Sequence, residues 1–445
     1  MSTIEQLEQQ LDDFNPARRH EALAALAAAA HAGKHQLPAP GVAHNLHAHT
    51  FFSYNAYGYS PSRFAWLARK AGLALGGIVD FDVLDGLEEF QAARRLLDLP
   101  GCTGMETRVF VSEFAQWSIN SPGEPGVAYT MGIGFPRRQI PAAAEQFMAG
   151  LRRTAEQRNR DLLARVNAFM APVTVDYEKD LLPLTPAGNA TERHICLAYA
   201  RKAQRLHPDA ADLKKFWAEK LGAEAEGADL PEGAKLQNLI RAKTMKKGGV
   251  GYVQPGPTSF PTLADFNQFV LACEALPALC WLDGTSEGEQ KIEELLRVAM
   301  STGCAALTII PDRNYKPGVQ DQKLKNLYHV VDLAQKLHLP VTVGTEMNSP
   351  GNKFVDSFEA AELKPLIPVF LRGAHIVYAH AALQREAGKG YLSAWAQHNY
   401  PAAADRNAFF EQVGKALVPA REAALASLPQ EATPAQVLAV ASSKN

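Results

Sequence analysis

Two histidines, His47 and His49, lie two positions apart in the stretch HNLHAHTFFS, residues 44–53. In a β-strand, residues i and i+2 point to the same side, so both imidazoles can face one point. Paired imidazoles of this kind are a common beginning of a metal site, which then needs further imidazole or carboxylate ligands. Other segments of the chain must therefore be searched for groups that could reach the same point.

Short apolar segments rich in β-forming residues recur along the chain, several of them followed by a helical stretch. They cover residues 41–46, 73–80, 102–111, 126–135, 278–283, 305–311 and 339–346. Strands that alternate with helices predict parallel βα units, and seven such segments favour an α/β barrel over an open sheet.

Helical periodicity dominates outside these segments. We predict an N-terminal helical segment at 1–40, a helical insertion at 137–250 and a C-terminal helical extension at 361–445. The barrel would then be formed by residues 41–136 and 251–360.

Polar side chains stand at or near the ends of the predicted strands, where the active site of a βα barrel lies. They are His47, His49, Asp80, Asp82, Glu106, Tyr129, Asp283, Asp312, Arg313, Glu346 and Asn348. A single strand-end aspartate is more often a helix cap or a turn former than a ligand. Together, however, imidazoles and carboxylates at several strand ends indicate a site for Zn²⁺, Mn²⁺ or Fe²⁺.

The order of these motifs resembles the PHP (polymerase and histidinol phosphatase) superfamily. The matching stretches are NLHAHTFFS, GIVDFDVLDGLEEF, GMETRV, YTMGIG, ALCWLDG and VTVGTEMNSP, which together span residues 44–350. Residues 189–203 and 245–282 resemble the helical insertion and return strand of PHP phosphoesterases that act on nucleoside bisphosphates and short RNA ends. The resemblance implies a distorted, TIM-like (β/α)7 barrel of PHP type with up to three divalent metals.

The resemblance also implies which residues would hold each metal. The first site would use His47, His49, Glu106 and Glu346, and all four positions carry a suitable ligand. A second, weaker site would use Glu106, Tyr129 and Asp283, and a third would need Asn55, Phe81 and Asn348. Because phenylalanine has no lone pair to donate, we expect one complete metal site, a doubtful second site and no third.

A metal-dependent hydrolase, and within that class a phosphoesterase, is the leading functional hypothesis. Such a metal lowers the pKa of bound water and polarises a phosphoryl oxygen. Asp80 or Asp283 could accept the proton of that water, and Tyr129 could donate one. By resemblance, His194 would reach the leaving group or phosphate. The side chains that could hold a small anionic substrate are Arg313, Lys316, Asn348 and Lys353.

Two alternatives stay open at this point. The missing histidines favour a different metal enzyme on the same barrel, such as an isomerase, a lyase or a C–N hydrolase. A non-catalytic, PHP-like binding protein is the other alternative, although four matching ligands at four separate strand ends argue against it.

Composition limits the partners and the compartment. Lys and Arg number 45 and Asp and Glu number 47, so no basic excess indicates a nucleic-acid groove or an anionic membrane surface. The five cysteines form no C-x-x-C pair, and the charged N-terminal stretch differs from a signal peptide. We therefore expect a cytoplasmic protein that acts on a small molecule, while the oligomeric state is left open.

Overall fold

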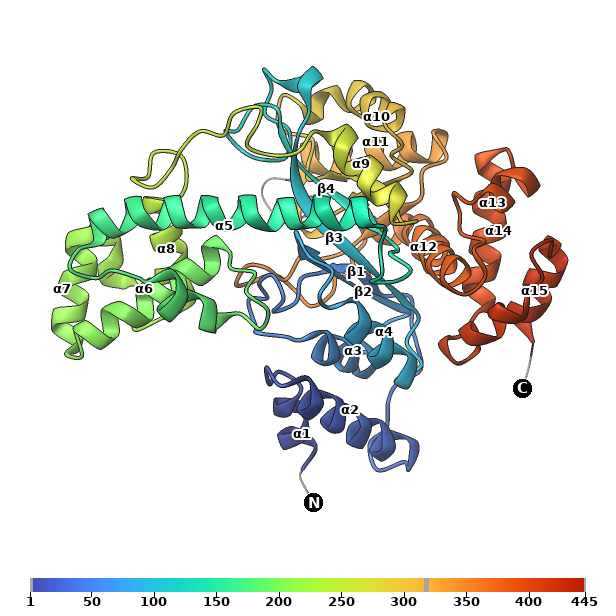
Figure 1. Cartoon of the computed structure of the whole chain (residues 1–445), viewed down its shortest axis with the longest axis horizontal. Coiled ribbons are helices and arrows are strands. Elements are labelled where there is room, and N and C mark those ends of the chain that lie inside the picture. Colours follow the sequence, from blue (N-terminus) through green and yellow to red (C-terminus); the bar gives the residue numbers. More distant parts are fainter. Residues whose placement is uncertain (1–2, 316–319, 444–445) are drawn as a thin grey trace. The chain divides into compact units, whose positions relative to one another are not determined.

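The computed structural model describes residues 3–315 and 320–443, so the predicted substrate contact Lys316 lies outside the described residues. The chain divides into two compact units, which are treated separately below (Figure 1). The first unit comprises Met1–Thr50, Asn55–Glu145 and Phe260–Asn445, and the second comprises Phe51–Tyr54 and Gln146–Ser259.

The first unit is built around a sheet whose seven strands follow one another in sequence order. They are β1 (His44–Ala48), β2 (Leu75–Phe81), β3 (Gly101–Phe110), β4 (Val127–Ile133), β5 (Leu276–Trp281), β6 (Ala306–Ile309) and β7 (Val341–Val343). A parallel bridge between Ala48 and Glu346 connects the end of β1 to the segment after β7. The sheet is therefore a nearly closed barrel, and the predicted α/β, TIM-like fold class is confirmed.

Strand β4 departs from the expected parallel pattern, because it runs antiparallel to both β3 and β5. The connection between β3 and β4 contains only the short 3₁₀ helix Ser112–Phe114. A parallel crossover needs a dozen or more residues and usually an α-helix, whereas antiparallel neighbours need only a turn or loop. The parallel βα pattern that the alternation of strands and helices predicted therefore does not extend to β4.

Helices cover the barrel and extend it at both chain ends. They are α1 (Ile4–Gln10), α2 (Pro16–His31), α3 (Pro61–Lys70), α4 (Leu87–Leu96), α9 (Leu263–Ala272), α10 (Ile292–Ser301), α11 (Gln320–Lys336), α12 (Ile367–Ala387), α13 (Ala394–Asn399), α14 (Ala403–Ala416) and α15 (Pro434–Ser442). Asn15 and Ser60 cap α2 and α3, and each is followed by a proline at the first helical position. A side-chain cap followed by proline is a strong local start signal for a helix.

Helix α12 packs at the end of the barrel where the parallel strands begin. A Cβ atom added at Gly373 would lie 2.0 Å from the carbonyl oxygen of Val341, the first residue of β7, so only glycine permits this approach. The stretch Lys364–Ala387 is long and apolar enough to cross a membrane, but 67% of its apolar window is buried inside the structure. Such burial is what a core helix of a globular unit shows.

The second unit is helical. It contains most of α5 (Ala142–Met170), together with α6 (Glu192–Leu206), α7 (Ala210–Leu221) and α8 (Ala234–Thr244). Its buried side chains, among them Tyr199 and Trp217, form a hydrophobic core of their own. The predicted helical insertion, 137–250, overlaps most of this unit.

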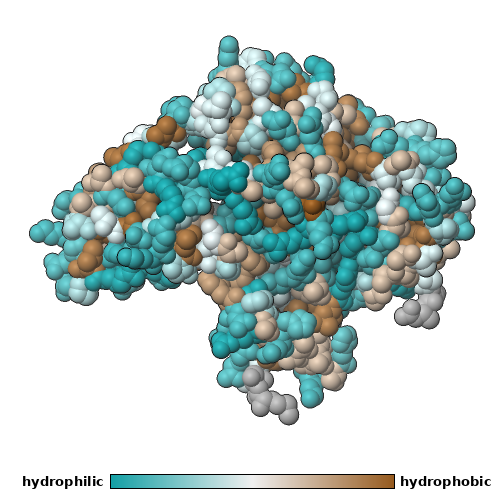
Figure 2. Space-filling view, viewed as in Figure 1, coloured by the Kyte–Doolittle hydropathy of each residue, from teal (hydrophilic) through white to brown (hydrophobic). Residues whose placement is uncertain are grey.

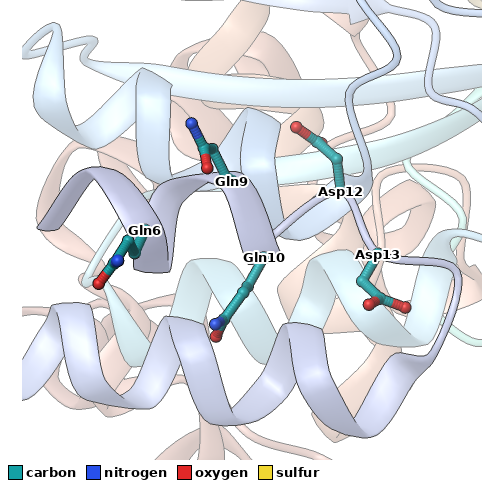
Figure 3. Close-up of a pocket in the computed structure, with 5 residues that line it drawn as sticks. All are labelled: Gln6, Gln9, Gln10, Asp12 and Asp13. Atoms are coloured by element: carbon teal, nitrogen blue, oxygen red, sulfur yellow. The ribbon is translucent and has the colours of Figure 1, made fainter. Parts of the chain in front are cut away.

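The face of the molecule in Figure 2 is mainly hydrophilic, with small hydrophobic patches between polar side chains. A shallow hollow near the N-terminus is lined by Gln6, Gln9, Gln10, Asp12 and Asp13 (Figure 3). Its lining comes only from α1 and the turn after it, and includes none of the predicted site residues.

Candidate metal centre

His47 lies on β1 and His49 directly follows it; both are buried, with ring centroids 5.3 Å apart. The segment after β7 approaches them so closely that a Cβ atom on Gly344 would lie 2.4 Å from the backbone nitrogen of His47. Asn45 accepts a hydrogen bond from that same nitrogen at 3.0 Å and donates to Thr345 at 2.9 Å. Close packing of the barrel seam thus holds the two histidines in place.

Glu106 on β3 meets both histidines. Its Oε2 lies 3.3 Å from Nε2 of His47 and 3.0 Å from Nε2 of His49. Burial by itself would raise the pKa of Glu106, but the charge and hydrogen bonds of the two imidazoles lower it to about 2. Burial lowers the pKa of His47, but the carboxylates of Glu106 and, to a smaller extent, Glu346 outweigh this, so the pKa of His47 is raised.

These three side chains have the spacing that a metal ion requires. One ligand atom from each lies within 4.8 Å of the others, and all three residues are buried. Ligands bound about 2.1 Å from one ion at tetrahedral or octahedral angles are about 3.0–3.4 Å apart, which matches the two measured nitrogen–oxygen distances. Two imidazoles and a carboxylate also form a donor set that suits Zn²⁺, Mn²⁺ or Fe²⁺.

The backbone of Glu346, the fourth predicted ligand, lies next to the backbone of the two histidines, but its side chain is not part of this cluster of three. Its backbone nitrogen donates to the carbonyl of His47 at 2.7 Å, and its carbonyl accepts from the nitrogen of His49 at 2.8 Å. Its carboxylate, however, pairs with the guanidinium of Arg313 at 2.9 Å. Coordination by Glu346 therefore stays a prediction.

Asp80, at the end of β2, holds the turn that follows β1. Its two carboxylate oxygens accept hydrogen bonds from the nitrogen of Thr50 at 2.8 Å and from its hydroxyl at 2.6 Å. The role of Asp80 as a catalytic base stays a prediction, and Thr50 is a contact that the sequence analysis missed. The only local signal for this contact was that Thr50 directly follows the second histidine.

Aromatic rings lie next to the histidines. Phe81 stacks on His49 with centroids 4.3 Å apart, and Tyr129 lies 6.0 Å from Phe81. Tyr129 reaches this end of the barrel because β4 is reversed, which pairs it with Arg108 beyond Glu106 on β3. Asn348 is half-buried two residues after Glu346, and its predicted substrate contact remains untested.

Asp283 lies in the loop after β5 and has local partners of its own. Its Oδ1 accepts a hydrogen bond from the nitrogen of Thr285 at 3.0 Å, and its Oδ2 pairs with Lys323 at 2.7 Å. Burial raises the pKa of Asp283, but Lys323 and Thr285 together lower it below its usual value. Asp283 is outside the cluster of three, so its predicted catalytic or ligand role stays a prediction.

Glu289 organises this loop, although the sequence analysis did not single it out. Its carboxylate accepts hydrogen bonds from the backbone nitrogens of Leu282, Asp283 and Gly284 at 2.6, 3.1 and 2.8 Å. Burial raises the pKa of Glu289 to about 7 despite these bonds. No local pattern distinguishes such a glutamate, because its partners become neighbours only when the loop folds back.

Lys353 follows β7 and is directed to an acidic neighbour. Its ammonium lies 2.8 Å from Oδ1 of Asp312 and 3.4 Å from the hydroxyl of Tyr315. To bind an anionic substrate as predicted, the Lys353 ammonium would have to contact the substrate as well as Asp312.

Asp356 lies near this pair and is buried. Neither of its carboxyl oxygens has a well-formed hydrogen bond among the described residues. Burial, and then the negative charge of Asp312, raise the pKa of Asp356 to about 8, while Lys353 opposes the shift. Asp356 is therefore protonated in the folded protein at neutral pH.

We expect Asp356→Asn to stabilise the protein at and above neutral pH. The folded-state pKa of Asp356 lies above its unfolded value of 3.8, so the free energy of unfolding decreases as pH rises from about 4 to about 8. Asparagine carries no proton to lose, so the variant should lack this part of the decrease, about 1.4 kcal/mol for each unit of the shift. Urea unfolding between pH 5 and 8 measures it. Asp332→Asn, at an exposed position, is the control. If Asp356→Asn were less stable than wild type at pH 8, the raised pKa of Asp356 would be contradicted.

His194 belongs to the second unit, near the start of α6. It is buried, its Nδ1 accepts a hydrogen bond from the nitrogen of Thr191 at 3.1 Å, and its ring lies edge-on to Tyr54 at 5.2 Å. Burial lowers the pKa of His194 to about 4, so the imidazole is neutral at physiological pH. These contacts give His194 a structural role in capping α6, and its predicted catalytic role stays a prediction.

Comparison with known proteins gives only distant similarity. No family model matches the chain, and no curated protein matches it. An amidohydrolase from Chromobacterium violaceum, solved with bound sulfate and no metal, is 18% identical with a TM-score of 0.47 over 69% of this chain and 88% of that chain. A candidate metal-dependent phosphoesterase from Bifidobacterium adolescentis is 18% identical with a TM-score of 0.47 over 75% and 98% of the two chains. At this level of similarity, neither structure assigns a function to this protein.

Proposed function

We propose that the protein is a metal-dependent hydrolase, and within that class a phosphoesterase that acts on a small phosphorylated molecule or nucleotide. The observation that carries this proposal is the buried cluster of His47, His49 and Glu106, whose ligand atoms are spaced for one ion. Glu346 would complete the coordination from the neighbouring seam of the barrel. When bound, the ion would lower the pKa of a water molecule and polarise an oxygen of the substrate.

The chain's own residues would bind and orient an anionic substrate. The half-exposed guanidinium of Arg313 lies at the rim next to Glu346, and its planar shape suits two hydrogen bonds to a phosphate. Asp80 and Asp283 are the carboxylates proposed to accept a proton, and Tyr129 is the proposed donor. His194 is proposed to contact the leaving group or the phosphate. Lys353 and Asn348 are proposed to contact the substrate from the segment after β7.

A second candidate is a different metal-dependent reaction, such as C–N bond hydrolysis, elimination or isomerisation. The ring of Phe81 stacked on His49 supports it, because an apolar ring there leaves room for one ion rather than several. Phosphoryl transfer is often assisted by two ions about 4 Å apart, so a site with one ion favours other chemistry.

The buried free thiols of all five cysteines agree with the proposed reducing, cytoplasmic location.

Metal analysis combined with a substrate panel tests these proposals. We expect purified protein to carry about one Zn²⁺, Mn²⁺ or Fe²⁺ per chain, and the metal-loaded protein to hydrolyse at least one phosphomonoester or nucleotide. An ion without phosphatase activity, but with activity on amides, would favour the second candidate. Failure of the metal-free protein to bind any of these ions in calorimetry would contradict both.

A further inference from the structure

The ion pair between Arg313 and Glu346 engages the carboxylate that the metal centre would need as its fourth ligand. Arg313 belongs to the short helix Pro311–Arg313 that follows β6, and its Nη2 lies 2.9 Å from Oε2 of Glu346. The arginine side chain is 46% exposed, whereas that of Glu346 is 12% exposed. In this arrangement, His47, His49 and Glu106 form a cluster of ligand atoms that Glu346 does not join.

The backbone of Glu346 is held in one position, so a change of partner can involve only its side chain. Two backbone hydrogen bonds tie it to His47 on β1 and to His49 directly after β1, and its φ of +64° lies in the left-handed region. Non-glycine residues adopt that region only where surrounding contacts enforce it. With the backbone fixed, rotation about the side-chain bonds is the movement by which the carboxylate would leave Arg313 and turn towards the histidines.

We propose that Arg313 competes with the metal ion for the carboxylate of Glu346, and that metal binding therefore releases Arg313 to bind an anionic substrate. The inference rests on the proposed metal site and adds a dependence of anion binding on metal loading. The positive charge of Arg313 interacts favourably with Glu346 and also with Glu106, and the same charge disfavours an ion at the cluster. Both effects lower metal affinity when Arg313 is present.

The proposal is tested by metal titration of four forms of the full-length, metal-free protein: wild type, Arg313→Met, Glu346→Gln and the double variant. Calorimetry with Zn²⁺ or Mn²⁺ alone gives the dissociation constants. We expect Arg313→Met to bind the ion about 10-fold more tightly, because methionine fills a similar volume without a charge. Glu346→Gln should bind it about 10-fold more weakly. In the Glu346→Gln background, Arg313→Met should change the metal dissociation constant by about 3-fold or less. Only the direct repulsion between Arg313 and the metal ion, screened by solvent and salt, then remains.

Arg372→Met is the matched control, because Arg372 pairs with Glu411 at the same distance of 2.9 Å on an exposed helix surface. It should leave the metal dissociation constant unchanged. Unchanged or weaker metal binding by Arg313→Met would overturn the competition, as would an equal effect of Arg313→Met with and without Glu346. Absence of metal binding in all four forms would overturn the proposed metal site itself and this inference with it. Circular dichroism before each titration verifies that every variant is folded.

Discussion

Replacing His47 by alanine is expected to abolish metal binding and catalytic turnover together. His47 supplies one of the three ligand atoms that cluster in the described part of the chain, and its Nε2 lies 3.3 Å from Oε2 of Glu106. Loss of an outer-shell partner of a metal ligand already costs about 10–100-fold in affinity, so loss of a ligand should cost more than about 100-fold. Elemental analysis of the purified variant and calorimetry with Zn²⁺ or Mn²⁺ measure this directly.

The control is His329→Ala, which removes an exposed imidazole on α11 and should bind metal like wild type. Glu106→Gln provides an independent variant, because it keeps the size of the side chain and removes only the charged oxygen. It should lose the ion as His47→Ala does, while circular dichroism reports a folded protein. Wild-type metal affinity in both His47→Ala and Glu106→Gln would show that the ion binds elsewhere.

Replacing Glu422 by alanine is expected to reduce the free energy of unfolding by about 3–5 kcal/mol, because it leaves the buried guanidinium of Arg94 without its carboxylate partner. Glu422 receives two hydrogen bonds from Arg94, at 2.6 and 2.8 Å, and one from Arg385 at 2.6 Å. The side chains of Arg94 and Glu422 are 0% and 1% exposed. The network joins α4, α12 and the C-terminal 3₁₀ helix Pro419–Ser427, so its loss should loosen the C-terminal extension.

The same network should make stability depend on acid pH. Burial would raise the pKa of Glu422, but the charges and hydrogen bonds of Arg94 and Arg385 lower it to about 2. Because the folded pKa lies below the unfolded value of 4.5, this stabilisation is present above about pH 4.5 and is lost as pH falls towards 2. Urea unfolding of wild type at pH 7 and pH 3 should show a larger decrease than the same comparison for Glu422→Ala.

A more exposed network in the C-terminal half of the chain provides the control. Glu411 pairs with Arg372 and Lys415, whose side chains are both 55% exposed, so Glu411→Ala should cost only about 0–1 kcal/mol. If Glu422→Ala and Glu411→Ala lowered the urea midpoint equally, burial of the Arg94–Glu422 pair would have no special energetic role.

Local sequence patterns were sufficient to predict much of the architecture. Each of the seven apolar segments became a strand, because alternating β-branched and apolar side chains favour a pleated, buried backbone wherever the segment lies. Caps such as Asn15 and Ser60 start helices through contacts with the next three residues only. The pair His47–His49 likewise faces one point because the period of a strand is two.

The direction of β4 could not be read from its own residues. Whether a strand runs parallel or antiparallel depends on the connection before it, and the loop after Phe110 contains only a three-residue 3₁₀ helix and no α-helix to carry the chain back. The reversal in turn determines that Tyr129, near the start of β4, lies at the same end of the barrel as Phe81.

The sequence by itself determined the fold class, the seven strands and the two histidines that begin the candidate metal centre, because these depend on periodicity within a few residues. The resemblance implied that Glu106 joins the histidines, and only the tertiary structure decided that the carboxylate of Glu346 pairs with Arg313. Only the tertiary structure, likewise, brought Arg94 to Glu422, which are 328 residues apart in the chain. A charged side chain takes as its partner whichever opposite charge the fold brings within about 3–4 Å, and no local pattern encodes that neighbour.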